Sequence, residues 1–113
     1  MHEYSIVSAL LERVCAEARA HNATAVHRLT LRIGNAAGIE PELLSKAYEH
    51  VRAGTICAGA ELCVERVEEL WVCPVCRRTL GRCAVLSCEG CGMPARLISG
   101  DEIILERIEM EVP

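Results

Sequence analysis

The sequence predicts an α/β (α+β) domain with two helices and three strands, into which a cysteine-rich module is inserted. Two segments have the helical spacing of apolar residues, and three have the length and alternation of strands. The stretch 72–97 has neither period and holds five of the eight cysteines. With 113 residues, the chain is long enough for one compact domain with a small appendage.

The first helix is predicted over residues 4–21 and the first strand over residues 26–33. The helix has an apolar stripe at helical spacing, formed by Val7, Leu10, Leu11, Val14 and Ala18. In the strand, Leu29, Leu31 and Ile33 alternate with polar residues. This alternation is typical of a half-buried strand.

The second helix is predicted to begin at Pro41, because proline suits the first helical position. Residues 34–38 before it read as a loop, and Glu40 lies near the positive helix end. The apolar stripe consists of Leu43, Leu44, Ala47, Tyr48 and Val51. Gly54 is expected to close the helix.

Two further strands are predicted over residues 61–71 and 102–112. The alternation of the first is imperfect around Val67, which leaves room for a bulge. A solitary terminal strand is unstable, so residues 102–112 are expected to return to the first domain's sheet. The predicted domains are therefore 1–71, completed by the strand segment 98–113, and an insertion at 72–97 between two neighbouring strands.

Composition and charge limit the functional classes. The net charge of −4 argues against binding nucleic acid through its phosphates. No segment approaches the roughly 20 apolar residues of a membrane helix, and no secretory signal is visible. We expect an unexported, cytoplasmic protein in a reducing environment, where eight cysteines indicate a metal site rather than a disulfide framework.

Two Cys-x-x-Cys pairs, Cys73 with Cys76 and Cys88 with Cys91, are separated by eleven residues. Each pair can chelate one ion through a tight turn, and together they form a closed four-thiolate cage. This pattern is typical of structural zinc, which holds a module together and leaves no open position for substrate. Four thiolates also accept iron, so a rubredoxin-like electron carrier is an alternative.

The remaining cysteines and histidines have simpler interpretations. Cys83 lies between the pairs and could replace Cys88 as a ligand, although it lacks a Cys-x-x-Cys partner. Small hydrophobic roles are expected for Cys15, Cys57 and Cys63. His27 and His50 are expected to be packed or surface residues without a metal.

The first three residues, Met1, His2 and Glu3, offer a second kind of metal site. A large residue at position 2 hinders removal of Met1, whose amine has an ordinary pKa near 7.7–8.0, while imidazole has one near 6.5. The amine, the backbone nitrogen and Nδ1 of His2, and the backbone nitrogen of Glu3 can form a plane. Such a plane favours nickel(II) or copper(II) over tetrahedral zinc. Residue types alone leave open that His2 is incidental.

Three stretches together resemble the HypA/HybF family of nickel metallochaperones, and the similarity spans essentially the whole chain. They are the start Met1-His2-Glu3-Tyr4-Ser5, the stretch from Leu31-Arg32-Ile33-Gly34 through Gly38-Ile39-Glu40-Pro41-Glu42-Leu43, and the paired Cys-x-x-Cys insert. Cys83 and the apolar pair Ala36-Ala37 depart from what we expect of this family. Glu40 could lie near the nickel end, although a helix-start carboxylate is the simpler reading.

The resemblance implies a carrier, not an enzyme, that delivers Ni(II) during maturation of [NiFe]-hydrogenase; some relatives also serve urease. It implies nickel at Met1, His2 and Glu3, structural zinc at the four paired cysteines, and two helices on a three-stranded mixed sheet with a zinc-ribbon-like module. The implied partners are a companion GTPase and the hydrogenase large-subunit precursor, without nucleic acid or membrane. We expect a monomer or weak homodimer. The alternative is a zinc-ribbon module that binds protein or nucleic acid.

Overall fold

The computed structural model describes residues 2–77, 79–80, 88 and 92–113, without the side chains of His2 and Leu80. In order, the elements are α1 (His2–Ala20), β1 (Ala25–Gly34), a 3-10 turn (Asn35–Ala37), α2 (Pro41–Val51), β2 (Glu61–Val67), β3 (Leu70–Val72), β4 (Thr79–Leu80), β5 (Arg96–Ser99) and β6 (Ile103–Glu111). They form two compact units. Unit 1 comprises Met1–Arg32, Ile39–Glu65 and Ile104–Pro113; unit 2 comprises Ile33–Gly38 and Arg66–Ile103.

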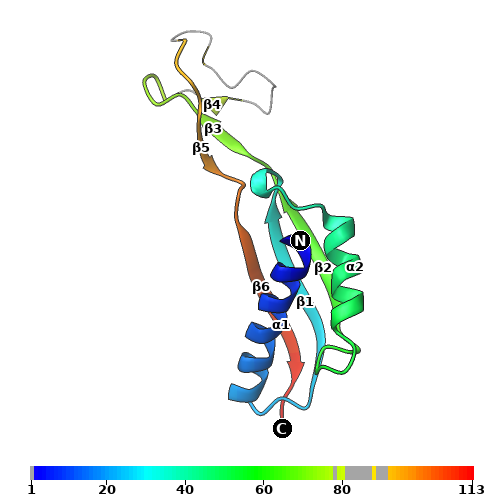
Figure 1. The fold of residues 1–113 in the computed structure, drawn as a ribbon. Helices are drawn as coiled ribbons and strands as arrows, with labels where there is room; N and C mark the ends of the chain where they lie inside the picture. Colours follow the sequence, from blue (N-terminus) through cyan, green and yellow to red (C-terminus); the bar gives the residue numbers. More distant parts are fainter. Residues whose placement is uncertain (1, 78, 81–87, 89–91) are drawn as a thin grey trace. The chain divides into compact units, whose positions relative to one another are not determined.

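The larger sheet has the strand order β2-β1-β6, and α1 and α2 cover the same face of it (Figure 1). The amide of Thr24 donates to the carbonyl of Glu111, and that of Gly34 donates to the carbonyl of Glu102. β1 and β6 are therefore antiparallel, whereas β1 and β2 run in the same direction (Figure 1). The predicted mixed three-stranded sheet with two helices is confirmed.

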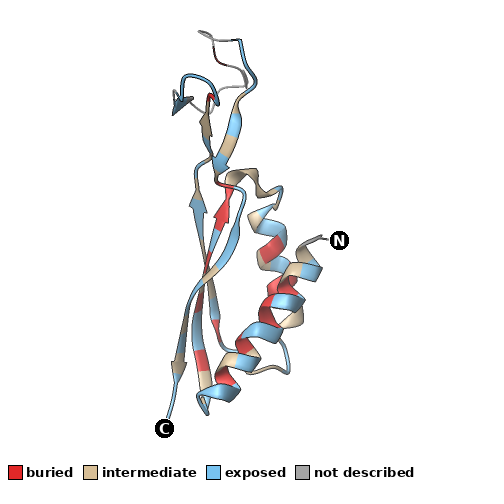
Figure 2. Cartoon of the chain, turned by 90° about the vertical axis from the view of Figure 1, so that its left-hand side faces the viewer, coloured by how far each residue is buried: buried red, intermediate tan, exposed pale blue. Residues whose placement is uncertain are grey.

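The core of unit 1 lies between the helices and the sheet (Figure 2). The whole predicted stripe of α1 is buried, as are Leu29 and Leu31 of β1. In α2, Leu44, Ala47 and Tyr48 are buried, but Leu43 is 50% exposed, so its assignment to the stripe was wrong. Each large aliphatic side chain in this core stabilises the fold by about 1.5–3 kcal/mol relative to exposure.

The ends of α2 differ in how well the sequence predicted them. Pro41 occupies the first turn, and Glu40 is the N-cap residue, as expected from proline's fixed φ. The helix ends at Val51 with Arg52 as its C-cap, so the prediction that Gly54 closes it was wrong. Gly54 lies in the following turn, at φ +79°.

The loop after α2 is fixed by a buried hydrogen bond. The hydroxyl of Tyr48 donates to the carbonyl of Ala60 over 2.8 Å, and the guanidinium of Arg52 donates to the same oxygen over 2.7 Å. Burial raises the pKa of Tyr48 to about 12, so its hydroxyl stays protonated and keeps donating at neutral pH.

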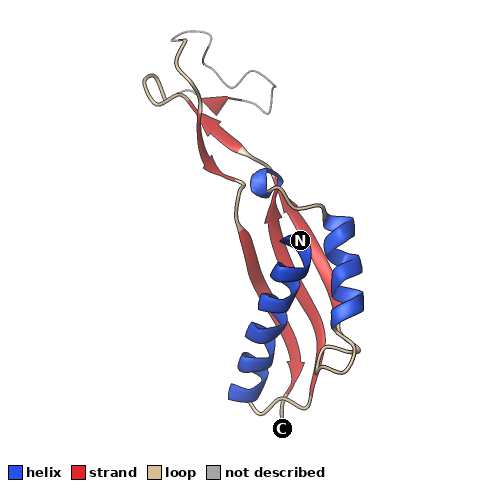
Figure 3. Cartoon of the chain, viewed as in Figure 1, coloured by secondary structure: helices blue, strands red, loops and turns tan. Residues whose placement is uncertain are grey.

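Unit 2 contains a second sheet with the strand order β4-β3-β5, in which both pairings are antiparallel (Figure 3). Trp71 pairs with Leu80 on one side and with Leu97 on the other, next to a register shift at Leu70. The prediction of one strand over residues 61–71 was wrong, because the chain leaves the first sheet after Val67. The stretch 72–97, in which no period is visible, contains β4 and the start of β5.

Two glycines allow three backbone segments of unit 2 to cross closely. A Cβ on Gly34 would collide with the carbonyl of Gly100, and a Cβ on Gly100 would lie 2.6 Å from the Cα of Glu69. Gly100 also has a φ of +101°, a conformation that residues other than glycine rarely adopt. The amide of Ala36 donates to the carbonyl of Gly100 over 2.7 Å, which fixes the crossing.

The expected return of the last strand is confirmed, because β6 joins β1. In the sequence, the cysteine-rich stretch lies between β2 and β6. These strands flank β1 on its two sides, so the prediction that they are neighbours was wrong. The domain boundaries 1–71 with 98–113, and 72–97, stay predictions. Among the described residues, no helix is both long and apolar enough to cross a membrane.

Candidate metal centres

The first Cys-x-x-Cys pair forms a turn directly after β3. The amide of Arg77 donates to the carbonyl of Cys73 over 2.8 Å, which closes the turn around the residues between them. Arg77 has a φ of +60°, the left-handed conformation that lets the chain reverse at this point. Cys73 is buried and Cys76 is exposed, so this turn presents one sulfur from inside and one from outside.

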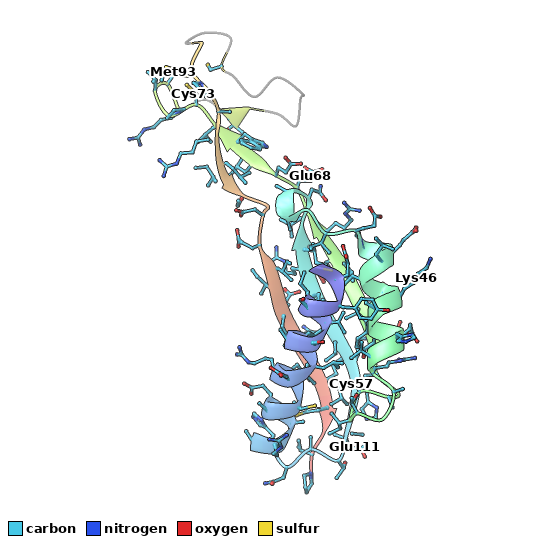
Figure 4. The ribbon with its side chains drawn as sticks, in the orientation of Figure 1. Lys46, Cys57, Glu68, Cys73, Met93 and Glu111 are labelled. Atoms are coloured by element: carbon cyan, nitrogen blue, oxygen red, sulfur yellow. The ribbon has the colours of Figure 1, made fainter. Side chains whose placement is uncertain are left out.

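The second pair repeats this geometry where the structure describes it. The amide of Gly92 donates to the carbonyl of Cys88 over 2.7 Å, and Gly92 has a φ of +68°. The amide of Cys88 in turn donates to the carbonyl of Met93 over 3.0 Å. In Figure 4, Met93 lies beside Cys73 in unit 2. Each turn is therefore closed by the residue that directly follows its second cysteine.

Three of the four predicted zinc ligands lie together. The sulfur atoms of Cys73, Cys76 and Cys88 all lie within 4.8 Å of one another, and those of Cys76 and Cys88 are 3.6 Å apart. A tetrahedron with Zn–S bonds of about 2.3 Å has sulfur–sulfur edges of about 3.8 Å. The spacing of these thiols therefore fits a zinc ion. The fourth predicted ligand, Cys91, and the alternative Cys83 lie outside the described residues.

The first turn also favours the thiolate form that a metal requires. Backbone hydrogen bonds from Cys76 and then Val75, together with the neighbouring thiols of Cys76 and Cys88, lower the pKa of Cys73 to about 6. Burial opposes this shift but is outweighed by the amide donors. A thiolate at position 73 is thus already favoured at neutral pH by the local backbone.

The predicted nickel site is only partly within the described residues. Met1 lies outside them, and the side chain of His2 is not described. The backbone of His2 begins α1, which starts two residues before the predicted boundary, and half-buried Glu3 is the acidic residue of its first turn. The first four amides of a helix have no acceptor within it. The amides of His2 and Glu3 are therefore not used by the hydrogen bonds of α1.

Other residues considered in the sequence have ordinary surroundings. Glu40 is exposed, and its backbone carbonyl accepts the amide of Leu44. Cys57 is buried and Cys15 and Cys63 are half-buried, as small hydrophobic residues can be. His27 contacts Glu111 at 3.3 Å, and the ring of His50 lies edge-on to Tyr4 with centroids 6.3 Å apart.

The sequence analysis missed how the first of the two Cys-x-x-Cys turns is closed. It assigned Arg77 no backbone role, yet this residue adopts the left-handed conformation that Gly92 adopts in the second turn. The available signal was positional, because both residues immediately follow a Cys-x-x-Cys pair. A non-glycine residue at positive φ is uncommon, which is why residue type alone did not identify it.

Comparison with known proteins covers the whole chain. The sequence profile of the family described as "Hydrogenase/urease nickel incorporation, metallochaperone, hypA" matches residues 1–110. The hydrogenase maturation factor HypA of Shewanella oneidensis is 37% identical, covering 98% of this chain and 96% of that protein. The protein of the same name from Aquifex aeolicus is 36% identical, covering 99% of each chain.

Solved structures agree with this result. The solution structure of the Ni metallochaperone HypA from Helicobacter pylori has a TM-score of 0.70 and 27% identity, covering 98% of each chain. A second structure, titled as the solution structure of HypA protein, has a TM-score of 0.74 and 28% identity, covering 100% of this chain and 98% of the other. The chain therefore belongs to the HypA family of hydrogenase and urease nickel-incorporation metallochaperones.

Proposed function

We propose that this chain binds Ni(II) as cargo at its N-terminus and delivers it during maturation of [NiFe]-hydrogenase, with relatives that also serve urease. The nickel ligands are the amine of Met1, the backbone nitrogen and Nδ1 of His2, and the backbone nitrogen of Glu3. The observation that carries the proposal is the start of α1 at His2, within a chain of this family. It leaves the amides of His2 and Glu3 without helical acceptors.

The position of these amides also selects the metal. The start of a helix carries a partial positive charge, which disfavours a simple cation. A divalent metal that displaces the two amide protons adds no net charge to this end, because the protons it releases carry away as much charge as it brings, and the carboxylate of Glu3 supplies negative charge nearby. Nickel(II) favours the square plane that such nitrogen ligands form, whereas zinc favours a tetrahedron.

The thiols of unit 2 have a separate role in this proposal. Cys73, Cys76 and Cys88, with Cys91 as the fourth ligand, hold structural zinc. A saturated four-thiolate site has no open position for substrate, so zinc here supplies folding free energy rather than chemistry. The close spacing of the three described sulfurs supports this role.

Delivery requires partners, and we propose two. A companion GTPase and the precursor of the hydrogenase large subunit would receive or pass on the nickel, in the cytoplasm. The chain itself catalyses no reaction in this scheme. It holds nickel tightly enough to keep it from free solution and loosely enough to hand it on.

Nickel calorimetry on the untagged, zinc-loaded chain tests the proposal. We expect one strong site in the native chain and its loss in His2→Ala, with unchanged zinc content and circular dichroism. The control is His21→Ala, which removes the same side chain just beyond the other end of α1, where Nδ1 of His21 contacts the carbonyl of Glu17. Loss of nickel binding in the control, or its retention in His2→Ala, would contradict the assignment.

Two further arms of the same titration address the amine and the imidazole. A residue added before Met1 should weaken nickel binding, because it moves the amine away from His2. Affinity should also fall between pH 7.5 and 5.5, because protons compete for the same nitrogens, whose ordinary pKa values lie near 6.5 and 7.7–8.0. Equal affinity at both pH values would remove these nitrogens from the site.

A further inference from the structure

The ring of Tyr4 occupies the N-terminal end of the apolar stripe of α1. Residues 4, 7, 11, 14 and 18 follow one another at intervals of three and four, which places them on one face of a helix. The last four, Val7, Leu11, Val14 and Ala18, are buried, whereas Tyr4 is 39% exposed. The core of unit 1 therefore ends one turn short of the start of α1.

The described ring contact of Tyr4 comes from α2. The start of α1 lies beside α2 (Figures 1 and 2). The rings of Tyr4 and His50 have centroids 6.3 Å apart and planes at 78° to each other, which is the edge-to-face arrangement that aromatic pairs favour. His50 lies in the last turn of α2, three residues after buried Ala47. The contact thus joins the first turn of one helix to the last turn of the other.

The ring of Tyr4 packs on the backbone that carries the proposed nickel ligands. Side chains on a helix lean toward its N-terminus and cover the turn that precedes their own Cα. Tyr4 therefore covers the turn that begins at His2, which includes the amides of His2 and Glu3. His50 is exposed and supports this ring from the solvent side.

A contact at this position affects the terminus more than the fold. The terminal turns of helices fray, because opening them costs almost no free energy. A ligand that needs an ordered terminal turn binds more weakly when the turn has to be ordered during binding. One edge-to-face ring contact changes an equilibrium about two- to tenfold. That is enough to decide whether a fraying turn is ordered, and it is small beside the stability of a whole domain.

We propose that His50 is a positioning residue of the N-terminal nickel site. By packing against Tyr4, it orders the first turn of α1 before nickel arrives and so raises the affinity for nickel. The nitrogens of His50 are not ligands in this arrangement. The inference rests on the proposed function, because it takes the amides of His2 and Glu3 as nickel ligands. It adds that a residue of α2, far from the terminus in sequence, sets how tightly the cargo is held.

Nuclear magnetic resonance of the zinc-loaded, nickel-free chain tests the ordering by itself. We expect the heteronuclear NOE of the backbone amides of residues 3–6 to fall in His50→Ala. It should stay native in His50→Phe, which keeps a flat ring at the same place. His27→Ala is the matched control, because it removes another exposed histidine from unit 1. An unchanged NOE in His50→Ala, or an equal fall in the control, would overturn the inference.

Nickel calorimetry of the same zinc-loaded variants tests the consequence. His50→Ala should bind nickel about two- to tenfold more weakly than the native chain, whereas His50→Phe should bind as the native chain does. If a nitrogen of His50 were a ligand, the two variants would lose affinity equally, which would contradict a positioning role. A double variant with Tyr4→Ala and His50→Ala should bind as weakly as Tyr4→Ala alone, because both residues act through one contact. Additive losses would also contradict it.

The His2→Ala variant separates this inference from the proposed function. Nickel binding that survives His2→Ala would refute the proposed site, and the positioning role with it. Loss of binding in His2→Ala together with native affinity in His50→Ala would refute the positioning role alone. Circular dichroism and zinc content, which should be native in every variant, check that a loss of affinity does not come from unfolding.

Discussion

Units 1 and 2 each contain a three-stranded sheet, which is mixed in unit 1 and antiparallel in unit 2, but different interactions stabilise the two units. In unit 1, α1, α2 and β1 bury large aliphatic side chains against one another. Among the described residues of unit 2, the buried apolar side chains are Ile33, Cys73 and Cys88, whereas Val75 and Ile98 are exposed. Unit 1 has an apolar core, and unit 2 has a cluster of thiols in its place.

In the proposed function, this difference gives zinc and nickel separate tasks. A unit without an apolar core needs another source of folding free energy, which zinc can supply. A unit with a complete core keeps its fold when a metal binds or leaves. Cargo held by the terminus of unit 1 can therefore be gained and lost without unfolding the carrier.

The largest predicted effect is the loss of unit 2 on removal of zinc. Structural zinc sites contribute on the order of 10 kcal/mol or more at neutral pH, which exceeds what the few buried side chains of unit 2 can supply. After chelation, amide hydrogen exchange should become fast in β3 and β5 and stay slow in α1 and β1. Equal protection of β3 with and without zinc would show that unit 2 has a core of its own.

Leu29→Ala should destabilise unit 1 and leave unit 2 unchanged, the reverse of zinc removal. Leu29 is fully buried in unit 1, and deleting its side chain leaves a cavity that costs about 2–5 kcal/mol of unfolding free energy. Denaturant unfolding measures the loss, and zinc content should not change. Leu43→Ala is the matched control, because Leu43 is 50% exposed and should cost less than about 1 kcal/mol. Equal losses in the two variants would place the core elsewhere.

Gly100→Ala should destabilise unit 2 by about 2–3 kcal/mol, because the new Cβ meets the backbone of Glu69 and φ is +101°. Hydrogen exchange of β5 measures the loss, while the thiols should still bind zinc. The control is Gly59→Ala, since a Cβ at Gly59 has no atom within 4 Å. An unchanged exchange rate in Gly100→Ala would mean that the three segments do not cross as described.

Tyr48→Phe should have the smallest effect, a loss of about 1 kcal/mol in unit 1. The variant removes the buried hydrogen bond to the carbonyl of Ala60, but Arg52 still donates to that oxygen and keeps it satisfied. Thermal unfolding compares it with Tyr4→Phe, in which the hydroxyl is removed from a 39% exposed ring. A loss above about 3 kcal/mol would mean that Arg52 does not compensate.

The sequence predicted the helices and the core of unit 1 well, because their apolar period is a local property. It took the irregularity at Val67 for a bulge and missed the break there, since apolar residues resume at Leu70 and only the distant crossing of Gly34 and Gly100 shows where the chain leaves the sheet. The strands β4 and β5 have two and four residues, too few for an alternation to be visible.

The two candidate metal sites also differed in how well the sequence predicted them. Cysteine spacing is local, so it predicted ligands of which three lie together in the structure. The proposed nickel site would use a terminal amine and backbone nitrogens, which leave no residue pattern beyond one histidine. Residue types suggested this site but left open that His2 is incidental, the resemblance to a family then favoured nickel, and the assignment of Met1, His2 and Glu3 stays a prediction.

X-ray absorption at the nickel and zinc edges of the doubly loaded chain tests the division of tasks most directly. We predict nickel surrounded by four nitrogen atoms in a plane, and zinc surrounded by four sulfur atoms at about 2.3 Å. Sulfur neighbours at the nickel edge would place the cargo in unit 2, and nitrogen neighbours at the zinc edge would place zinc outside the thiol cluster. Either result would contradict the account.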